Sequence, residues 1–193
     1  KGYSQQELDA CGLFKRNDRG NVYCLFWKRV MTPIFDLRGN IIAFGGRVMD
    51  DSKPKYVNSP ETLVYHKSET VFALQIAKRS ASRRYVLCEG YMDVISMQQA
   101  GIDTAVCACG TALTPQQVRL ISEYADEVIL SYDSDEAGQK ATLRSLELFR
   151  NSPVKVGVLQ IPAQRTRTST SKNMAPNGSR RCWTAWATRW TSG

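Results

Sequence analysis

Acidic side chains follow two short apolar runs of the chain, at the points where each run ends. Glu89 follows the run 85–88, and Asp133 and Asp135 follow the run 127–132. Ligands of open α/β sheets bind outside the carboxyl ends of the strands, so these carboxylates can converge although they are far apart in the sequence. Gathered carboxylates repel one another unless a cation joins them, and Mg²⁺ prefers such oxygen ligands.

Each motif also has a purely structural interpretation. Asp-x-Asp before a helix is typical of an N-cap, and Glu-Gly after a strand is typical of a turn. Here both motifs occur together, each at the end of an expected strand, and Asp93 lies one turn beyond Glu89. The combination favours a metal site for phosphoryl transfer, formed by Glu89, Asp133 and Asp135 with Asp93 in support.

Helices and apolar strands alternate in the part of the chain that carries these acids. We expect helices over about 70–82, 91–100, 114–124 and 136–150, and strands over 85–88, 104–107, 127–132 and 154–158. The third helix opens on Thr114-Pro115-Gln116-Gln117, a capping box with proline at the first helical position. Short strands separated by helices predict β-α-β units, and therefore an α/β fold with a parallel sheet flanked by helices.

The first seventy residues predict a small mixed α/β subdomain. A helical pattern begins at Ser4, and apolar runs at 22–26, 30–35 and 41–44 predict strands, the last two joined by a hairpin turn. Beyond residue 46 the chain is polar and carries two prolines, which predicts a long ordered loop. We therefore expect one unit over residues 1–69 and a second over 70–162.

The net charge of +8 belongs to the end of the chain. Residues 148–193 hold eight basic residues and no acid, whereas residues 1–147 are neutral. Residues 163–193 also lack Leu, Ile and Val, so we expect this tail to be disordered. No run approaches the ~18 apolar residues of a membrane span, and no signal peptide is evident. We expect a cytoplasmic protein without a membrane partner.

The six cysteines and the single histidine do not indicate a zinc or redox site. The chain has no Cys-x-x-Cys pair, and most of the cysteines stand in apolar runs where a thiol behaves as a small hydrophobe. We therefore expect no zinc in this chain.

The acidic motifs and their neighbours resemble a known family. Glu89-Gly90-Tyr91-Met92-Asp93, together with Asp133-Ser134-Asp135-Glu136-Ala137-Gly138, is similar to the TOPRIM fold of topoisomerases, some nucleases and bacterial primases. Over about residues 2–162 the chain resembles the catalytic core of bacterial DnaG-type DNA primases. The strings that carry this likeness are Phe44-Gly45-Gly46-Arg47, Pro54-Lys55-Tyr56-Val57-Asn58-Ser59-Pro60-Glu61-Thr62, Lys67 and Gly110-Thr111-Ala112-Leu113-Thr114.

The resemblance implies a DNA primase, a DNA-directed RNA polymerase that makes RNA primers in DNA replication. It implies that Glu89, Asp133 and Asp135 hold Mg²⁺ or Mn²⁺, with Asp93 in support. It further implies single-stranded DNA template and nucleoside triphosphates as partners, and a replicative helicase bound through a domain absent here. The residues matching the family's template- and nucleotide-binding surface are Arg29, Arg47, Lys55, Tyr56, Asn58 and Lys67.

Taken alone, these basic residues would be read as solvated surface charge. The physical argument for binding is that phosphate oxygens need Arg or Lys partners near the metal. The chain departs from the family at Trp27, where a basic residue is usual, and this indicates a lower affinity for the template.

The tail also departs from the family. Such primases continue into an acidic stretch such as Lys-Asp-Pro-Asp-Glu-Tyr-Ile-Lys, whose aspartates complete the metal site. Residues 165–171 instead read Arg-Thr-Arg-Thr-Ser-Thr-Ser, which is the translation of AAG GAC CCG GAC GAG TAC ATC A begun one nucleotide late. We hypothesise a frameshift near residues 163–164; the rival interpretation is a genuine basic arm for nucleic acid. A frameshift predicts weak or absent primer synthesis, with residual Mn²⁺ binding.

Two other functions remain open. A TOPRIM nuclease or topoisomerase would keep the acids but need a partner segment, such as a nucleophilic tyrosine in another domain. A non-catalytic TOPRIM module would bind DNA without turnover. The chain begins without an initiator methionine and within the region of likeness, so we expect a fragment of a longer primase.

Overall fold

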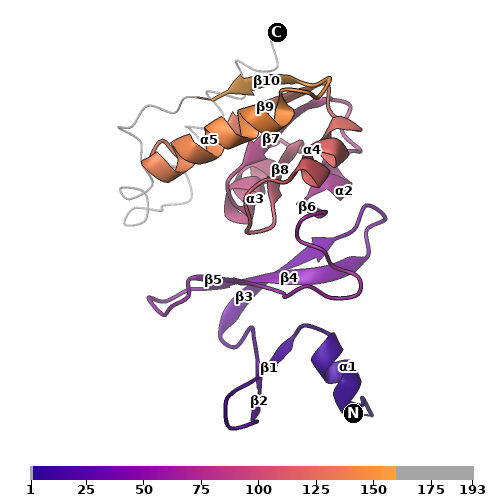
Figure 1. The fold of residues 1–193 in the computed structure, drawn as a ribbon, viewed down its shortest axis with the longest axis vertical. Helices are drawn as coiled ribbons and strands as arrows, with labels where there is room; N and C mark the ends of the chain where they lie inside the picture. The colour runs from indigo at the N-terminus through magenta and orange to yellow at the C-terminus, as the bar shows by residue number, and fades with distance from the viewer. Residues whose placement is uncertain (1, 160–193) are drawn as a thin grey trace.

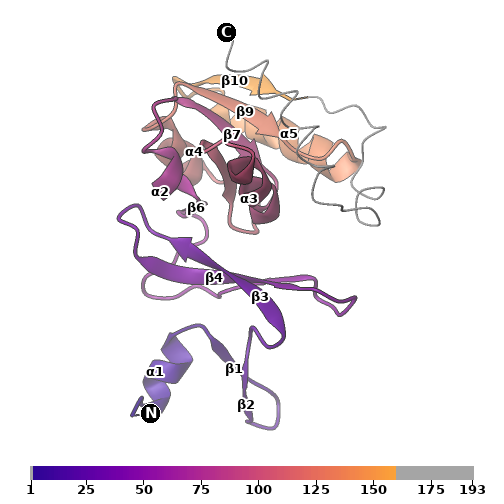
Figure 2. The same cartoon turned by 180° about the vertical axis from the view of Figure 1, so that it is seen from behind.

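The computed structural model describes residues 2–159, and the expected tail lies outside them. Figures 1 and 2 show three layers along the long axis: a helix with a small hairpin at one end, a three-stranded sheet in the middle, and a five-stranded sheet with its helices at the other end. The α/β fold predicted from the sequence is confirmed.

The first layer holds α1 (Gln5–Ala10), β1 (Phe14–Arg16) and β2 (Val22–Cys24). Ser4 is the N-cap of α1, as predicted, and it forms a reciprocal capping box with Glu7. Strands β1 and β2 pair in antiparallel fashion. The strand predicted over 22–26 ends at Cys24, because residues 25–28 form a turn. Strand β1 was not predicted.

The middle layer is an antiparallel sheet of β3 (Arg29–Phe35), β4 (Ile41–Val48) and β5 (Tyr56–Asn58). The β3–β4 hairpin was predicted, but β4 continues through Gly45 and Gly46. Strand β5 lies inside the predicted loop, which is a correction. Its three residues are strand because β4 supplies their hydrogen-bonding partners, a non-local cause that polar, proline-marked sequence does not reveal.

The third layer is a five-stranded sheet in the order β10-β9-β7-β8-β6. The strands are β6 (Val71–Phe72), β7 (Arg84–Cys88), β8 (Ala105–Ala108), β9 (Glu127–Ser131) and β10 (Lys155–Val158), and the helices are α2 (Leu74–Ala77), α3 (Tyr91–Gln99), α4 (Pro115–Ser122) and α5 (Glu136–Phe149). Strands β10, β9, β7 and β8 are parallel, as predicted.

The predicted helix over 70–82 is wrong in its first part. Residues 71–72 form β6, which pairs in antiparallel fashion with β8, and the helix is reduced to the single turn of α2. Ala73 between them has a positive φ of 65°, which prevents a continuous helix across this point. The apolar residues of this segment satisfy both a strand and a helix pattern, and pairing with β8 decides between them.

The core lies on both faces of β7, whose residues 85–88 are all buried. Tyr85 and Leu87 face a cluster with α4, α5 and β9. Val86 and Cys88 face a second cluster, which contains α3 and also Ile34 of the middle sheet. The middle sheet and the five-stranded sheet therefore share one apolar cluster. Among the described helices, none is long and apolar enough to span a bilayer.

Candidate metal and nucleic-acid site

Glu89 and Asp133 lie side by side at the carboxyl edge of the five-stranded sheet. Strands β7 and β9 are parallel neighbours, with Cys88 opposite Ser131, so both strands deliver their next residues to the same edge. The backbone N–H of Asp133 donates a hydrogen bond to Oε2 of Glu89 over 3.3 Å. Two carboxylate-bearing residues from separate strands are thus in direct contact.

Asp135 has a structural task in addition. It is the N-cap of α5, and its Oδ1 accepts a hydrogen bond of 2.8 Å from the backbone N–H of Gly138. Asp93 lies in the first turn of α3, beyond Gly90. Over residues 2–159, no three His, Cys, Asp or Glu side chains are grouped closely enough to hold a metal ion. Metal binding by Glu89, Asp133, Asp135 and Asp93 therefore stays a prediction.

Gly138 brings α5 close to the loop that carries Asp133. A Cβ atom at residue 138 would lie 2.0 Å from the carbonyl oxygen of Asp133, so only glycine fits there. The absent side chain lets the first turn of α5 pack directly on this loop. Gly138 thereby fixes the position of Asp133 relative to the cap at Asp135.

Two tyrosine rings connect the acidic edge to the basic residues of the middle sheet. Tyr91, two residues beyond Glu89, packs edge-on against Tyr56 of β5, with ring centroids 5.6 Å apart. Cζ of Arg47 and Nζ of Lys55 each lie 5.9 Å from the centroid of Tyr56. The structure thus brings Arg47, Lys55 and Tyr56 together beside the helix that follows Glu89.

Arg29 lies at the start of β3 and holds the hairpin that carries Lys55. Its guanidinium donates hydrogen bonds to the carbonyl oxygens of Pro54 and Lys55, over 2.8 and 3.3 Å. Arg29 therefore positions Lys55, whatever further contacts its charge makes. Asn58 donates from Nδ2 to the carbonyl oxygen of Cys109 over 3.4 Å, which ties β5 to the end of β8.

Lys67 is positioned through its backbone by a buried glutamine. Nε2 of Gln117 donates to the carbonyl oxygens of Lys67 and Thr70, each over 2.8 Å, and Gln117 is fully buried. Gln117 is also the second member of the predicted capping box, whose partner is Thr114. One side chain thus starts α4 and fixes the segment that carries Lys67.

Three buried polar atoms where the middle sheet meets α3 have no hydrogen-bond partner: Nε of Arg47, Oδ1 of Asn58 and Oη of Tyr91. Burial raises the pKa of Tyr91 to about 12, although the positive charges of Arg47 and Arg29 act in the opposite direction. The Tyr91 hydroxyl therefore stays protonated at neutral pH.

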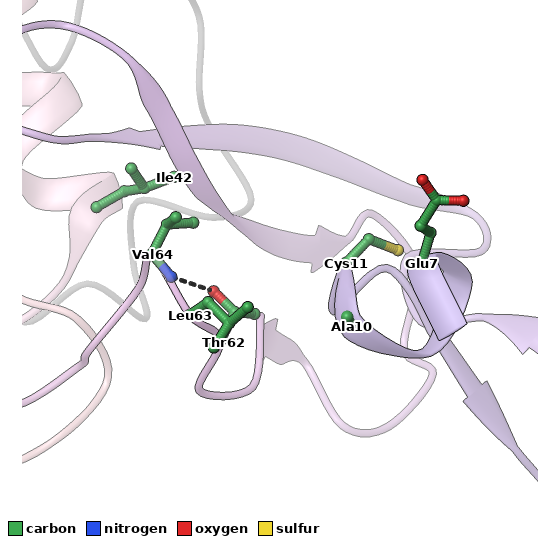
Figure 3. Close-up of a pocket in the computed structure, with 7 residues that line it drawn as sticks. All are labelled: Glu7, Ala10, Cys11, Ile42, Thr62, Leu63 and Val64. Carbon is green, nitrogen blue, oxygen red and sulfur yellow. Dashed lines mark hydrogen bonds between the residues drawn. The ribbon is translucent and has the colours of Figure 1, made fainter. Parts of the chain in front are cut away.

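Sequence reasoning did not single out Tyr91 or Gln117 as parts of this site. Tyr91 was visible within the acidic motif, but its contact with Tyr56 depends on how the two sheets pack. Gln117 was recognised only as a capping residue. A solvent-open pocket elsewhere involves neither of them: Figure 3 shows it between α1 and the turn at Thr62, Leu63 and Val64. None of the predicted site residues lines that pocket.

The acidic edge fits a hard divalent ion. Its donors are carboxylate oxygens, and Mg²⁺ is commonly held by one or two carboxylates with waters and substrate phosphates completing its shell. Glu89 and Asp133 follow adjacent strands, and the carboxylate of Glu89 accepts the backbone N–H of Asp133. An ion held at this edge would also contact phosphates, next to arginine and lysine side chains that attract the same phosphates.

Two family models match the chain. A model described as "DNA primase catalytic core, N-terminal domain" matches residues 1–78, and a "Toprim-like" model matches residues 86–167. Among curated proteins, the DNA primase of Clostridium acetobutylicum is 45% identical over 84% of this chain and 27% of its own length. The DNA primase of Escherichia coli K12 is 42% identical over 75% of this chain and 25% of its own length.

Solved structures of primase catalytic domains also resemble this chain. A DNA primase domain from Pseudomonas aeruginosa has a TM-score of 0.76 and 40% identity, covering 83% of this chain and 53% of that chain. The E. coli primase catalytic core has a TM-score of 0.78 and 36% identity, with coverage of 87% and 55%. The chain spans about a quarter of the length of the curated relatives it matches.

Proposed function

The chain belongs to the family of bacterial DnaG-type DNA primases, and we propose that it carries the metal- and template-binding part of a site for RNA primer synthesis in DNA replication. The observation that carries the proposal is the contact between Glu89 and Asp133 at the carboxyl edge of the sheet. Arg47 and Lys55 lie around Tyr56, which packs on the helix that follows Glu89.

Toprim domains bind divalent metal ions. In this chain Glu89 and Asp133 would hold Mg²⁺ or Mn²⁺, with Asp135 contributing the carboxylate oxygen that does not cap α5 and Asp93 in support. Such an ion relieves negative charge on phosphoryl oxygens during nucleotidyl transfer. The role of the acidic residues is to fix the ion at the edge of the sheet, where nucleotide phosphates can reach it.

The basic residues would bind and orient the nucleic acid. Arg47 and Lys55 contact phosphates of the template or of nucleoside triphosphates, and Arg29 keeps Lys55 in place. Tyr56 and Asn58 shape this surface, and Lys67 adds charge from the neighbouring loop. One similar structure is described as the DnaG primase catalytic domain bound to single-stranded DNA. We propose single-stranded DNA as template here too, in the cytoplasm, with a replicative helicase bound through another part of a longer primase.

Nucleotide incorporation tests the proposal. We would measure labelled nucleoside triphosphate incorporation on single-stranded DNA with Mg²⁺ or Mn²⁺, using the chain and a version in which residues 165–171 read Lys-Asp-Pro-Asp-Glu-Tyr-Ile. The restored version is expected to incorporate nucleotides and the chain itself weakly or not at all. Glu89→Gln should abolish incorporation, whereas Glu123→Gln, which changes an exposed acid at the end of α4, should leave it intact.

A non-catalytic DNA-binding module is the second candidate. It is favoured by the capping role of Asp135 and by the lack of a three-carboxylate group within residues 2–159. The same experiment separates the two functions. If the restored version binds the oligonucleotide but incorporates nothing, or if Glu89→Gln keeps full incorporation, the primase assignment fails and the binding module is preferred.

A further inference from the structure

The β1–β2 hairpin places a basic and an aromatic side chain next to each other on an exposed surface. Lys15 is the cross-strand partner of Tyr23, and paired residues of an antiparallel ladder share one face. Both side chains are exposed. Residues 14–31 hold five basic residues against a single acid, Asp18, so this segment is positively charged although residues 1–147 as a whole are neutral.

The turn after the hairpin holds an indole in the solvent. Trp27 is 72% exposed, whereas its neighbour Phe26 is buried. The ring of Phe26 occupies the space left by Gly46, where a Cβ atom would lie 2.6 Å from it. The turn is also closed by hydrogen bonds from Trp27 N–H to Cys24 and from Arg29 N–H to Phe26. Trp27 is therefore exposed on a fixed turn, so little backbone conformational entropy would be lost when it binds.

The turn is continuous with the basic residues near the acidic edge. Lys28 and Arg29 directly follow Trp27, and Arg29 bonds the hairpin that carries Lys55. Lys55 lies against Tyr56, which packs on Tyr91. In both ribbon views β1 and β2 lie on the far side of the middle sheet from the five-stranded sheet. A strand bound at the acidic edge could thus continue around the start of β3 to the hairpin.

We propose that Trp27 and Tyr23 form a stacking platform for the bases of single-stranded nucleic acid, with Lys15, Arg19 and Lys28 as phosphate partners. Aromatic faces stack on any base, and interleaved cations follow the phosphate backbone. The near absence of acids disfavours a basic protein partner. The inference rests on the proposed function, because it extends the path of the template beyond Arg47 and Lys55. An indole at residue 27 would partly replace a phosphate contact by stacking.

Oligonucleotide binding by the full chain tests the platform. The probe is a fluorescein-labelled 12-residue oligothymidylate, followed by fluorescence anisotropy in EDTA so that metal binding plays no part. Trp27→Ala should weaken binding about fivefold or more, the lower end of the effect of removing one stacking residue. Trp27→Phe, which keeps an aromatic face, should restore most of the affinity. Leu63→Ala, at an apolar residue that is 92% exposed outside the platform, should change nothing.

Salt dependence separates stacking from charge. Lys28→Asn removes a cation while suiting the positive φ of 54° at this residue, and it should reduce the slope of log K against log salt by about 0.7. Trp27→Ala should leave that slope unchanged. The platform is refuted if Trp27→Ala, shown by circular dichroism to be folded, binds as tightly as the parent chain. It is also refuted if only the sedimentation behaviour changes, because Trp27 would then contact another protein copy.

These outcomes are independent of the primase assignment. Loss of affinity in Trp27→Ala alongside absent incorporation in the restored version would keep the platform and remove the primase. Unchanged affinity alongside incorporation that needs Glu89 would keep the primase and remove the platform.

Discussion

Replacing Gln117 by alanine should destabilise the protein and displace Lys67. The Gln117 side chain makes three hydrogen bonds from a fully buried position: two from Nε2 to the carbonyl oxygens of Lys67 and Thr70, and one accepted by Oε1 from the N–H of Thr114. Alanine removes all three and leaves their backbone partners without a protein partner. Because Gln117 joins the loop to α4, the change acts on the fold and on the basic surface together.

The size of the effect follows from the number of bonds. Each hydrogen bond contributes about 0.5–1.5 kcal/mol net, so three give about 1.5–4.5 kcal/mol of lost unfolding free energy. For a domain of this size that corresponds to a melting temperature lowered by roughly 5–15 °C. Displacement of Lys67 should also weaken oligonucleotide binding. The binding constant should then depend less steeply on salt concentration, because a phosphate contact is lost.

The matched control is Gln116→Ala, since Gln116 is the exposed neighbour on the same helix turn. Urea unfolding followed by circular dichroism measures both variants, and anisotropy measures oligonucleotide binding. The reasoning is refuted if Gln117→Ala costs less than about 1 kcal/mol, or if the two variants have equal stability. Normal salt dependence in a destabilised Gln117→Ala would show that Lys67 does not touch phosphate.

Three other perturbations test the packing around the site. Tyr91→Phe keeps the ring contacts and removes a buried hydroxyl that has no hydrogen-bond partner, so its unfolding free energy should be equal to the parent's or up to about 1 kcal/mol higher. Tyr91→Ala also removes the ring and should lose about 3–5 kcal/mol. Gly46→Ala should lower the unfolding free energy measured in urea by about 1–3 kcal/mol, because the new Cβ would collide with the Phe26 ring. Gly90→Ala is the control and should cost less, because its Cβ would meet only a carboxylate oxygen at 3.7 Å. Equal losses in the two variants would contradict the close contact between Gly46 and Phe26. Burial raises the pKa of the Cys109 thiol from 9.0 to about 11, so the unfolded thiol ionises first. The contribution of this thiol to the unfolding free energy is therefore fully present below pH 9 and is lost as the pH rises towards 11. Between pH 9 and 11 the urea midpoint of the parent should fall more than that of Cys109→Ala.

Local signals in the sequence predicted those elements that depend on local causes. The capping boxes at Ser4 and Thr114 start their helices where predicted, because a cap and its partner lie three residues apart. Strands β5 and β6 were missed because each is made by pairing with a distant strand, β4 and β8. A strand of two or three residues is too short to show an alternating pattern, so the neighbouring prolines predict a loop at β5 and the helical period predicts a helix at β6.

The candidate site was predictable in its residue types but not in its contacts. Glu89 and Asp133 were expected to meet because strand ends and carboxylates can both be read from the chain, and the two residues do lie together. Metal binding by them, by Asp93 and by Asp135 stays a prediction. The roles of Arg29 and Gln117 as positioning residues depend on carbonyl oxygens 25 to 50 residues away. No spacing rule within one sequence gives such pairs.

Gly138 also limits how this protein could be engineered. Any side chain introduced there would collide with the main chain of Asp133 rather than with a flexible neighbour. A mutant library that aims to change ion preference can therefore vary the carboxylates themselves, but it should hold residue 138 constant. If residue 138 were varied as well, many members of the library would lose the loop geometry around Asp133, and changes in ion preference could not be attributed to the carboxylates.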